Sequence, residues 1–176
     1  MIDAANPVVF VAAESLGLEG TEKPAELEAM PRVIEQIEEL RIAAAVAMGV
    51  AASPHEARTK VRNIPQVGIL SRPREDGVHI TARMISTGQP HRATPLTGAM
   101  CLATAMRVPG TIAADLARLP ADANADLMIH HPTGKLPVAA RVDGGAEPHV
   151  HETVVYRTAR RLMEGAVLVP TRRLAA

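Results

Sequence analysis

The stretch Thr94–Arg107, with the sequence TPLTGAMCLATAMR, decides the fold of this chain. Its residues are apolar on nearly every face of a helix, so it predicts a helix that is buried on all sides. Pro109 and Gly110 end it. A helix without a polar face must be covered by other elements. With several strands around it in the sequence, it predicts an α+β domain in which a mostly antiparallel sheet is rolled around a central buried helix.

Apolar runs on either side of this helix supply the strands. A helical pattern with spacings of three and four covers Thr21–Met48, and Pro24 and Pro31 each begin a segment of it because proline suits a first helical turn. A short helix is expected at 112–119, and a polar loop at 50–63. Strands are expected at 8–12, 66–70, 78–85, 127–130, 136–142 and 166–169.

The segment Val150–Arg160 fits either a strand or, through Val155, Ala159 and Leu162, one face of a helix. Gly144-Gly145 and Glu164-Gly165 are typical of hairpin turns. The whole chain, 1–176, is expected to form a single domain without an internal repeat.

Composition excludes several function classes. The chain has 176 residues with 19 basic and 19 acidic side chains, and its two aromatic residues are Phe10 and Tyr156. Zero net charge and the lack of stacking side chains argue against a nucleic-acid partner. No apolar run is long enough to span a membrane, and the first residues do not resemble a signal peptide. A single cysteine, Cys101, fits a reducing compartment, so we expect a cytoplasmic protein without a membrane partner.

The segment Ser86–Cys101 holds the best candidate for an anion site. A loop of small residues leads into the start of the apolar helix, where Thr97, Gly98 and Ala99 form the first turn. The first amides of a helix have no internal acceptor and lie at the positive end of its dipole, so a carboxylate or phosphate can bind there. The alternative is that Thr94 or Thr97 only caps a core helix.

Three further groups of residues suggest chemistry, each with a simpler alternative. His91 suits an acid–base group or a donor to a bound anion, or is only a half-exposed loop histidine. His149 and His151 share one face of a strand, but no third ligand has a characteristic spacing, so we expect no metal. Cys101 is expected to be a small buried hydrophobe and not a nucleophile.

Six ordered motifs resemble one family. They are DAANPVVFV (3–11), IAAAVAMG (42–49), STGQPH (86–91), LTGAMC (96–101), HPTG (131–134) and RTARRLMEG (157–165). Together they resemble the C-terminal half of the PrpF-type isomerases, which include 2-methylaconitate isomerase and 4-oxalomesaconate tautomerase. The resemblance covers nearly the whole chain.

The resemblance implies a diaminopimelate-epimerase-like fold of two similar halves, with the active site in the cleft between them. It favours a strand at Val150–Arg160. The implied chemistry needs no cofactor: a proton leaves one carbon of an unsaturated di- or tricarboxylic acid and returns at an allylic position. Substrate-binding residues implied by the matching motifs are Asn6, Ser86, Gly88, His91, Thr97, Gly98 and Ala99. Of these, His91 is a possible catalytic residue.

The chain departs from the family pattern at three points. Pro95 occupies the position of the catalytic cysteine of the epimerases, so no thiol chemistry is carried over. Ala5 stands where glycine is often found. The lysine that acts as base in the family belongs to the N-terminal half, and Lys23, Lys60 and Lys135 match no such motif.

The resulting hypothesis is a cofactor-independent isomerase half-site that acts on a small di- or tricarboxylate. Its alternatives are a non-catalytic carboxylate-binding or assembly module, and a metal-dependent enzyme that uses His149 and His151. Half of a two-part fold exposes apolar surface, so the expected partner is a second copy of the chain or a separate N-terminal half.

Overall fold

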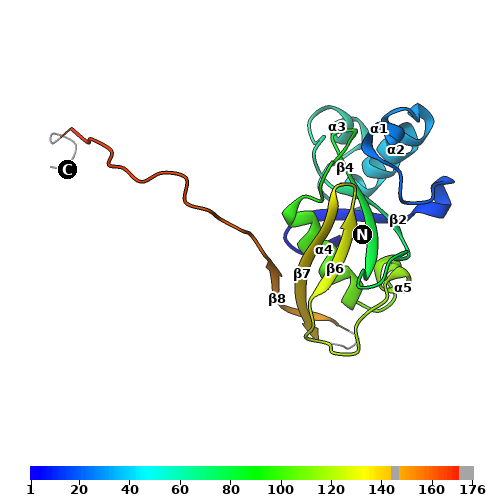
Figure 1. Cartoon of the computed structure of the whole chain (residues 1–176). Helices are drawn as coiled ribbons and strands as arrows, with labels where there is room; N and C mark the ends of the chain where they lie inside the picture. The colour runs from blue at the N-terminus through cyan, green and yellow to red at the C-terminus, as the bar shows by residue number, and fades with distance from the viewer. Residues whose placement is uncertain (144–146, 171–176) are drawn as a thin grey trace.

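A single mixed sheet organises the chain, with helices on both of its faces (Figure 1). The computed structural model describes residues 1–143 and 147–170. The strand order is β1-β2-β3-β4-β6-β7-β8, and β5 pairs with β4. The strands are β1 (Ile2–Asp3), β2 (Pro7–Ala12), β3 (Gln66–Ser71), β4 (Ile80–Ser86), β5 (Gln89–Pro90), β6 (Leu127–His131), β7 (Gly134–Asp143) and β8 (His149–Val155).

The α+β class is confirmed, and the pairing pattern is more varied than expected. The pairs β2–β3 and β4–β6 are parallel, whereas the other five are antiparallel. The sheet curls, and a bulge between Arg141 and Val142 bends the long β7–β8 hairpin. Each parallel pair requires a long crossover connection, which here contains helices.

The helices begin where the sequence has proline or a capping residue. They are the 3₁₀ turn η1 (Ala13–Leu16), α1 (Pro24–Glu28), α2 (Pro31–Ala47), α3 (Pro54–Thr59), α4 (Leu96–Arg107) and α5 (Ile112–Leu116). Helices α1 and α2 confirm the two segments predicted to begin at proline. Helix α3 lies in the expected loop: the Ser53 hydroxyl accepts a hydrogen bond from the Glu56 amide at 3.2 Å, and Pro54 takes the first turn.

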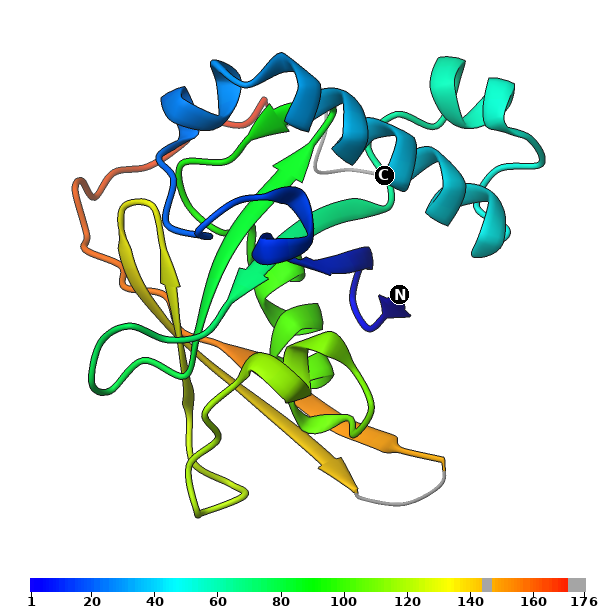
Figure 2. The same cartoon turned by 90° about the vertical axis from the view of Figure 1, so that its right-hand side faces the viewer.

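Alternation along the strands separates two apolar layers. Val8, Phe10 and Met84 face one side, where they pack with residues of α4. Val9 and Ile85 face the other side, where they pack with residues of α2. Figure 2 shows α2 and α4 on opposite sides of β3 and β4. Eight of the twelve residues of α4 are buried, as its composition predicted.

The predicted extent of the sheet at its C-terminal end is wrong. The strand predicted at Val150–Arg160 ends at Val155, and residues 156–170, including the strand predicted at 166–169 and the turn at Glu164-Gly165, have no regular secondary structure. Val155 pairs with Val138. The next residue of β7 is Pro137, which has no N–H to continue the ladder. The turn predicted at Gly144-Gly145 lies outside the described residues.

Within residues 1–143 and 147–170, none of the helices combines the length and the apolar character that a membrane crossing requires.

Candidate active site

A tight turn between β4 and β5 places Ser86 against His91. Thr87 and Gly88 adopt positive φ angles of 50° and 75°, which reverse the chain within two residues. The His91 amide then donates to the Met84 carbonyl at 2.8 Å. As a result the Ser86 Oγ and His91 Nε2 atoms lie 2.8 Å apart, within hydrogen-bond distance. Residues 89 and 90 form a two-residue strand in a segment that was expected to be irregular.

The environment of His91 favours a neutral ring. Burial lowers the pKa of His91, because removal from water destabilises the charged imidazolium. When Ser86 donates to Nε2, the ring proton of the neutral tautomer is on Nδ1. In this geometry the Nε2 atom of His91 is held by Ser86, and the Nδ1 atom is the one that can donate to a ligand.

The start of α4, five residues after His91 in the chain, presents backbone donors without a helical acceptor. Pro95 precedes the helix with an extended backbone and makes no side-chain cap. The first internal helical bond runs from the Ala99 amide to the Pro95 carbonyl at 2.8 Å. The amides of Leu96, Thr97 and Gly98 therefore have no helical acceptor. Ala99 was expected among the free donors, and this expectation is wrong because its amide is already used.

Two buried polar atoms near the helix start also have no partner among the described residues: the Thr94 hydroxyl and the Gln66 side-chain carbonyl oxygen. Thr94 is 7% exposed. Neither Thr94 nor Thr97 acts as a side-chain cap of the helix. A buried polar atom without a hydrogen bond is costly, so both atoms favour a polar ligand or water at this helix end.

Gly98 faces the interior of the protein. A Cβ atom at this position would lie 2.7 Å from Gln66 Oε1 and 2.9 Å from Met84 Cε. The lack of a side chain therefore allows α4 to approach β3 and β4. A larger residue here would first displace Gln66 and Met84, so a Gly98→Val variant tests packing and is a poor test of ligand access.

The strand register gathers segments that are far apart in the sequence. Val8 pairs with Gln66, and Val67 pairs with Ile85. The start of β2, the start of β3 and the end of β4 therefore lie at one end of the sheet, where Asn6 and Ser86 also lie. Gln66 was not predicted as a site residue. Nothing in its sequence neighbourhood marks it, because its position depends on this register.

Asn6 follows a strained residue. Ala5 has a φ angle of 95°, a conformation that favours glycine, which explains why glycine suits this position. The Asn6 amide nitrogen makes only a long contact of 3.5 Å to the carbonyl of its neighbour Pro7. Its donor capacity is largely unused.

Gly88 lies on a different surface from the other predicted residues. It lines a groove of about 490 Å³ together with Thr87 and with residues of α1, α2 and the α3 region, among them Glu28, Ile34, Glu35, Arg58 and Arg62. This groove is on the α2 side of the sheet. None of the residues of α4 lines this groove.

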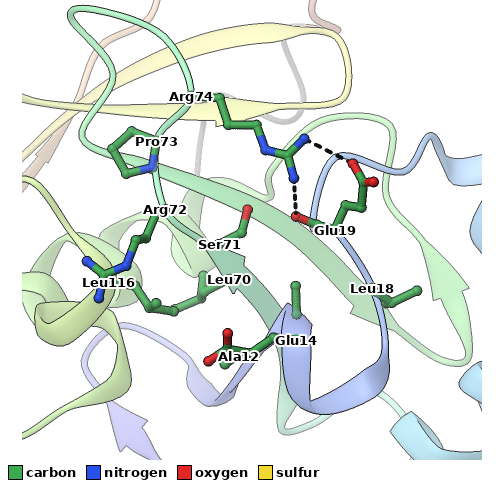
Figure 3. A pocket seen from close by; sticks show the side chains of 11 residues that line it. Ala12, Glu14, Leu18, Glu19, Leu70, Ser71, Arg72, Pro73, Arg74 and Leu116 are labelled. Carbon is green, nitrogen blue, oxygen red and sulfur yellow. Dashed lines mark hydrogen bonds and ion pairs between the residues drawn. The ribbon is translucent and has the colours of Figure 1, made fainter.

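A second cavity lies at the opposite end of β2 and β3 (Figure 3). It measures about 380 Å³ and contains none of the predicted site residues. Arg74 points to Glu19 across its rim, with a 3.0 Å ion pair and a 3.3 Å hydrogen bond to the Glu19 carbonyl. Arg74 and Glu19 therefore neutralise each other, while Glu14 and Arg72 also line the cavity.

The remaining candidates do not join the site. Cys101 is buried, its thiol lies 3.6 Å from the Ile2 carbonyl, and burial raises its pKa to about 12, so it is a poor nucleophile. The rings of His149 and His151 lie 4.8 Å apart on β8, and His151 pairs with Asp143 at 2.8 Å. The part of the chain that the structure describes contains no cluster of three or more metal-ligating side chains.

Comparison with known proteins identifies the same family for the whole described chain. A sequence model of the PrpF protein matches residues 1–170. The 3-methylitaconate isomerase of Eubacterium barkeri is 31% identical over 99% of this chain and 48% of its own length. The 2-methyl-aconitate isomerase of Shewanella oneidensis is 31% identical over 97% of this chain and 45% of its own length.

A solved structure agrees with this similarity. The crystal structure of a methylitaconate-delta-isomerase superposes with a TM-score of 0.86 and 30% identity, covering 99% of this chain and 47% of the solved chain. This chain therefore spans about half the length of the relatives that it matches. The match over residues 1–170 and the shared curled α+β fold lead to one conclusion: the chain belongs to the PrpF family.

Proposed function

We propose that this chain forms the carboxylate-binding half of an isomerase active site, which moves a proton and a double bond in an unsaturated di- or tricarboxylic acid. The observation that carries the proposal is the open N-terminus of α4, which begins five residues after His91, the hydrogen-bond partner of Ser86. The relatives are named as isomerases of methylitaconate, methylaconitate and oxalomesaconate, all of which are unsaturated carboxylic acids.

In this proposal the helix start holds one substrate carboxylate. The free amides of Leu96 and Thr97 donate to its oxygens, and the helix dipole adds a favourable field. His91 donates from Nδ1 while Ser86 fixes the ring through Nε2. Each hydrogen bond to a charged group contributes on the order of 1.5–3 kcal/mol.

The Asn6 amide completes the carboxylate site from the start of β2, where its donors are largely unused. Ser86 and Gln66 line the same end of the sheet, and α4 is the central helix of this half. The substrate binds in a cleft that this half forms together with a second half of similar fold. The proposed reaction requires no cofactor and takes place in the cytoplasm.

The reaction that this arrangement serves is a 1,3-proton shift. A C–H bond next to the double bond breaks, and its electron pair forms the new C=C bond. The former π pair takes up a proton at the far allylic carbon, so the composition is unchanged. Amides at the carboxylate stabilise the enolate-like charge between these two steps. As the family resemblance implies, the base is a lysine of the second half; Lys23, Lys60 and Lys135 of this chain match no such motif.

Two measurements test this function. Calorimetry with trans-aconitate should show binding to the chain alone, and the trimethyl ester, which lacks the charges, should not bind. Proton NMR should then show isomerisation of 2-methylaconitate or methylitaconate only when the half of the Eubacterium barkeri isomerase that this chain does not match is added.

The outcomes separate the two leading functions. Binding without turnover in any combination would favour a carboxylate-binding or assembly module, which the open helix start also permits. Equal binding of the acid and its ester would contradict both functions.

A further inference from the structure

The side-chain amide of Gln66, at the start of β3, has one buried end and one open end. Its oxygen, Oε1, is buried and has no hydrogen-bond partner among the described residues. Its nitrogen, Nε2, is not one of the buried atoms without a partner, and no hydrogen bond between described residues uses it. The nitrogen is therefore open to solvent, and its two N–H donors can bind a ligand.

The start of α4 explains this orientation of the amide. A Cβ atom at Gly98 would lie 2.7 Å from Gln66 Oε1 and 3.9 Å from Gln66 Cδ, so the oxygen is the end of the side chain that faces the helix. Gly98 is the third residue of α4, where the helix dipole places partial positive charge. This field attracts the carbonyl oxygen and repels N–H groups. It therefore holds the nitrogen on the side of the amide that points away from the helix.

The strand register places Gln66 among the residues of the proposed carboxylate site. Val67 pairs with Ile85, so the next pair in this antiparallel register is Gln66 with Ser86. Met84 packs against α4, and Ser86, two residues further along the strand, lies on the same face. Side chains directly opposite each other on one face have Cβ atoms about 4.5–5.5 Å apart. Gln66 therefore lies beside Ser86 and also approaches the first turn of α4.

We infer that Gln66 determines specificity for dicarboxylates: the start of α4 holds one carboxylate, and Gln66 Nε2 donates to a second carboxylate of the same ligand. Because the Gln66 donors point away from the helix, they bind a different group from the one that the helix amides hold. A hydrogen bond to a charged oxygen is stronger than one to a neutral oxygen, which favours a carboxylate at this position.

This inference rests on the proposed function, because it requires a ligand at the start of α4. It goes further by assigning recognition of the second carboxylate to one side chain. A monocarboxylate of the same shape lacks the group that Gln66 binds, so the site should bind it more weakly.

Calorimetry with two ligands that differ in one carboxylate tests this assignment. Fumarate carries two carboxylates, and trans-crotonate has a methyl group in place of one of them. The wild-type chain should bind fumarate more tightly than crotonate. Gln66→Met keeps the length of the side chain and removes the amide, so it should lower the affinity for fumarate about 10-fold and leave the affinity for crotonate nearly unchanged. Gln36→Met, at an exposed position of α2, is the matched control and should change neither affinity.

A second variant replaces only the outward atom of the amide. Gln66→Glu keeps an oxygen toward the helix and replaces the nitrogen with a negatively charged oxygen. It should weaken fumarate relative to crotonate by more than Gln66→Met does, because it places like charges together. Circular dichroism should show that both variants are folded. If Gln66→Met disturbs the packing against Gly98, the ratio of the two affinities in Gln66→Glu still tests the assignment.

The outcomes distinguish this inference from the proposed function. If the wild-type chain binds fumarate no better than crotonate, the inference is wrong while the proposed carboxylate site stands. The same holds if both Gln66 variants keep the wild-type preference for fumarate. If neither fumarate nor trans-aconitate binds to the wild-type chain, the proposed function fails, and the inference fails with it.

Discussion

At the scale of single residues, His91 links the backbone of the β4–β5 turn to the candidate ligand site. Its amide is anchored to Met84, and its ring is fixed by Ser86. Burial keeps the ring neutral near pH 7, since it lowers the pKa of His91. A neutral, oriented imidazole can donate to a carboxylate without carrying charge in the free protein.

Replacement of this histidine should weaken ligand binding selectively. In His91→Gln the side chain no longer places a ring donor at the carboxylate, and the dissociation constant of trans-aconitate should rise about 10-fold. His55→Gln is the matched control, because His55 is exposed on α3. Calorimetry measures both variants. Equal affinity for His91→Gln and wild type would show that the histidine is a turn residue without contact to the ligand.

Ala5 gives a second prediction at this scale, because its φ of 95° strains any residue with a Cβ atom. Such strain costs about 1–3 kcal/mol, and glycine loses about 0.5–1 kcal/mol more chain entropy than alanine. Ala5→Gly should therefore raise the free energy of unfolding by about 1 kcal/mol. Urea denaturation measures this change. Gly17→Ala, also at a positive φ of 69°, should shift stability in the opposite direction.

At the scale of elements, the start of α4 is where the site depends on backbone and not on side chains. The helix begins after Pro95, so three amides point outward without acceptors. This feature follows from helix geometry alone and could be predicted from the sequence. The bonding of the Ala99 amide could not, because it depends on which residue begins the helix.

Two substitutions at Leu96 measure the contribution of its backbone amide to ligand binding. Leu96→Pro removes the N–H, and the extended backbone of Pro95 (ψ 140°) accepts a following proline. Leu96→Ala removes a similar amount of side chain and keeps the N–H. The dissociation constant of trans-aconitate should rise about 10-fold in Leu96→Pro relative to Leu96→Ala. Circular dichroism should show intact helix in both variants. Identical affinities would exclude this amide from the site.

The elements that could be predicted are those whose signal is local. The composition of α4 and the prolines of α1 and α2 predicted these helices within a few residues. Helix α3 was missed because it has one buried side chain, Ala57, and therefore no apolar period. Gln66 was missed as a site residue because strand register, a long-range property, brings it beside Ser86. Residues 166–169 have the local pattern of a strand, but a strand also requires a partner.

At the scale of the whole molecule, the curled sheet buries one histidine, His131, and partly buries three more, His79, His91 and His130. Burial lowers the pKa values of His79, His91, His130 and His131. Several of these rings act as acceptors in their neutral form: the Met128 amide donates to His79 Nδ1 at 2.7 Å. The fold therefore disfavours protonation of several histidines at once.

This common shift makes stability depend on pH in a defined direction. An unfolded histidine has a pKa of about 6.5. Each folded pKa is lower, so below about pH 6.5 the unfolded state binds more protons than the folded state. The stabilisation is fully present above this pH and is lost as the pH falls through the folded pKa values. The free energy of unfolding, measured in urea, should decrease from pH 7.5 to about pH 5, where carboxylates are still mostly ionised. His91→Gln should reduce the slope of the free energy of unfolding against pH. His55→Gln, at an exposed position, should retain the wild-type slope. A flat profile for the wild-type protein would contradict the burial of these rings.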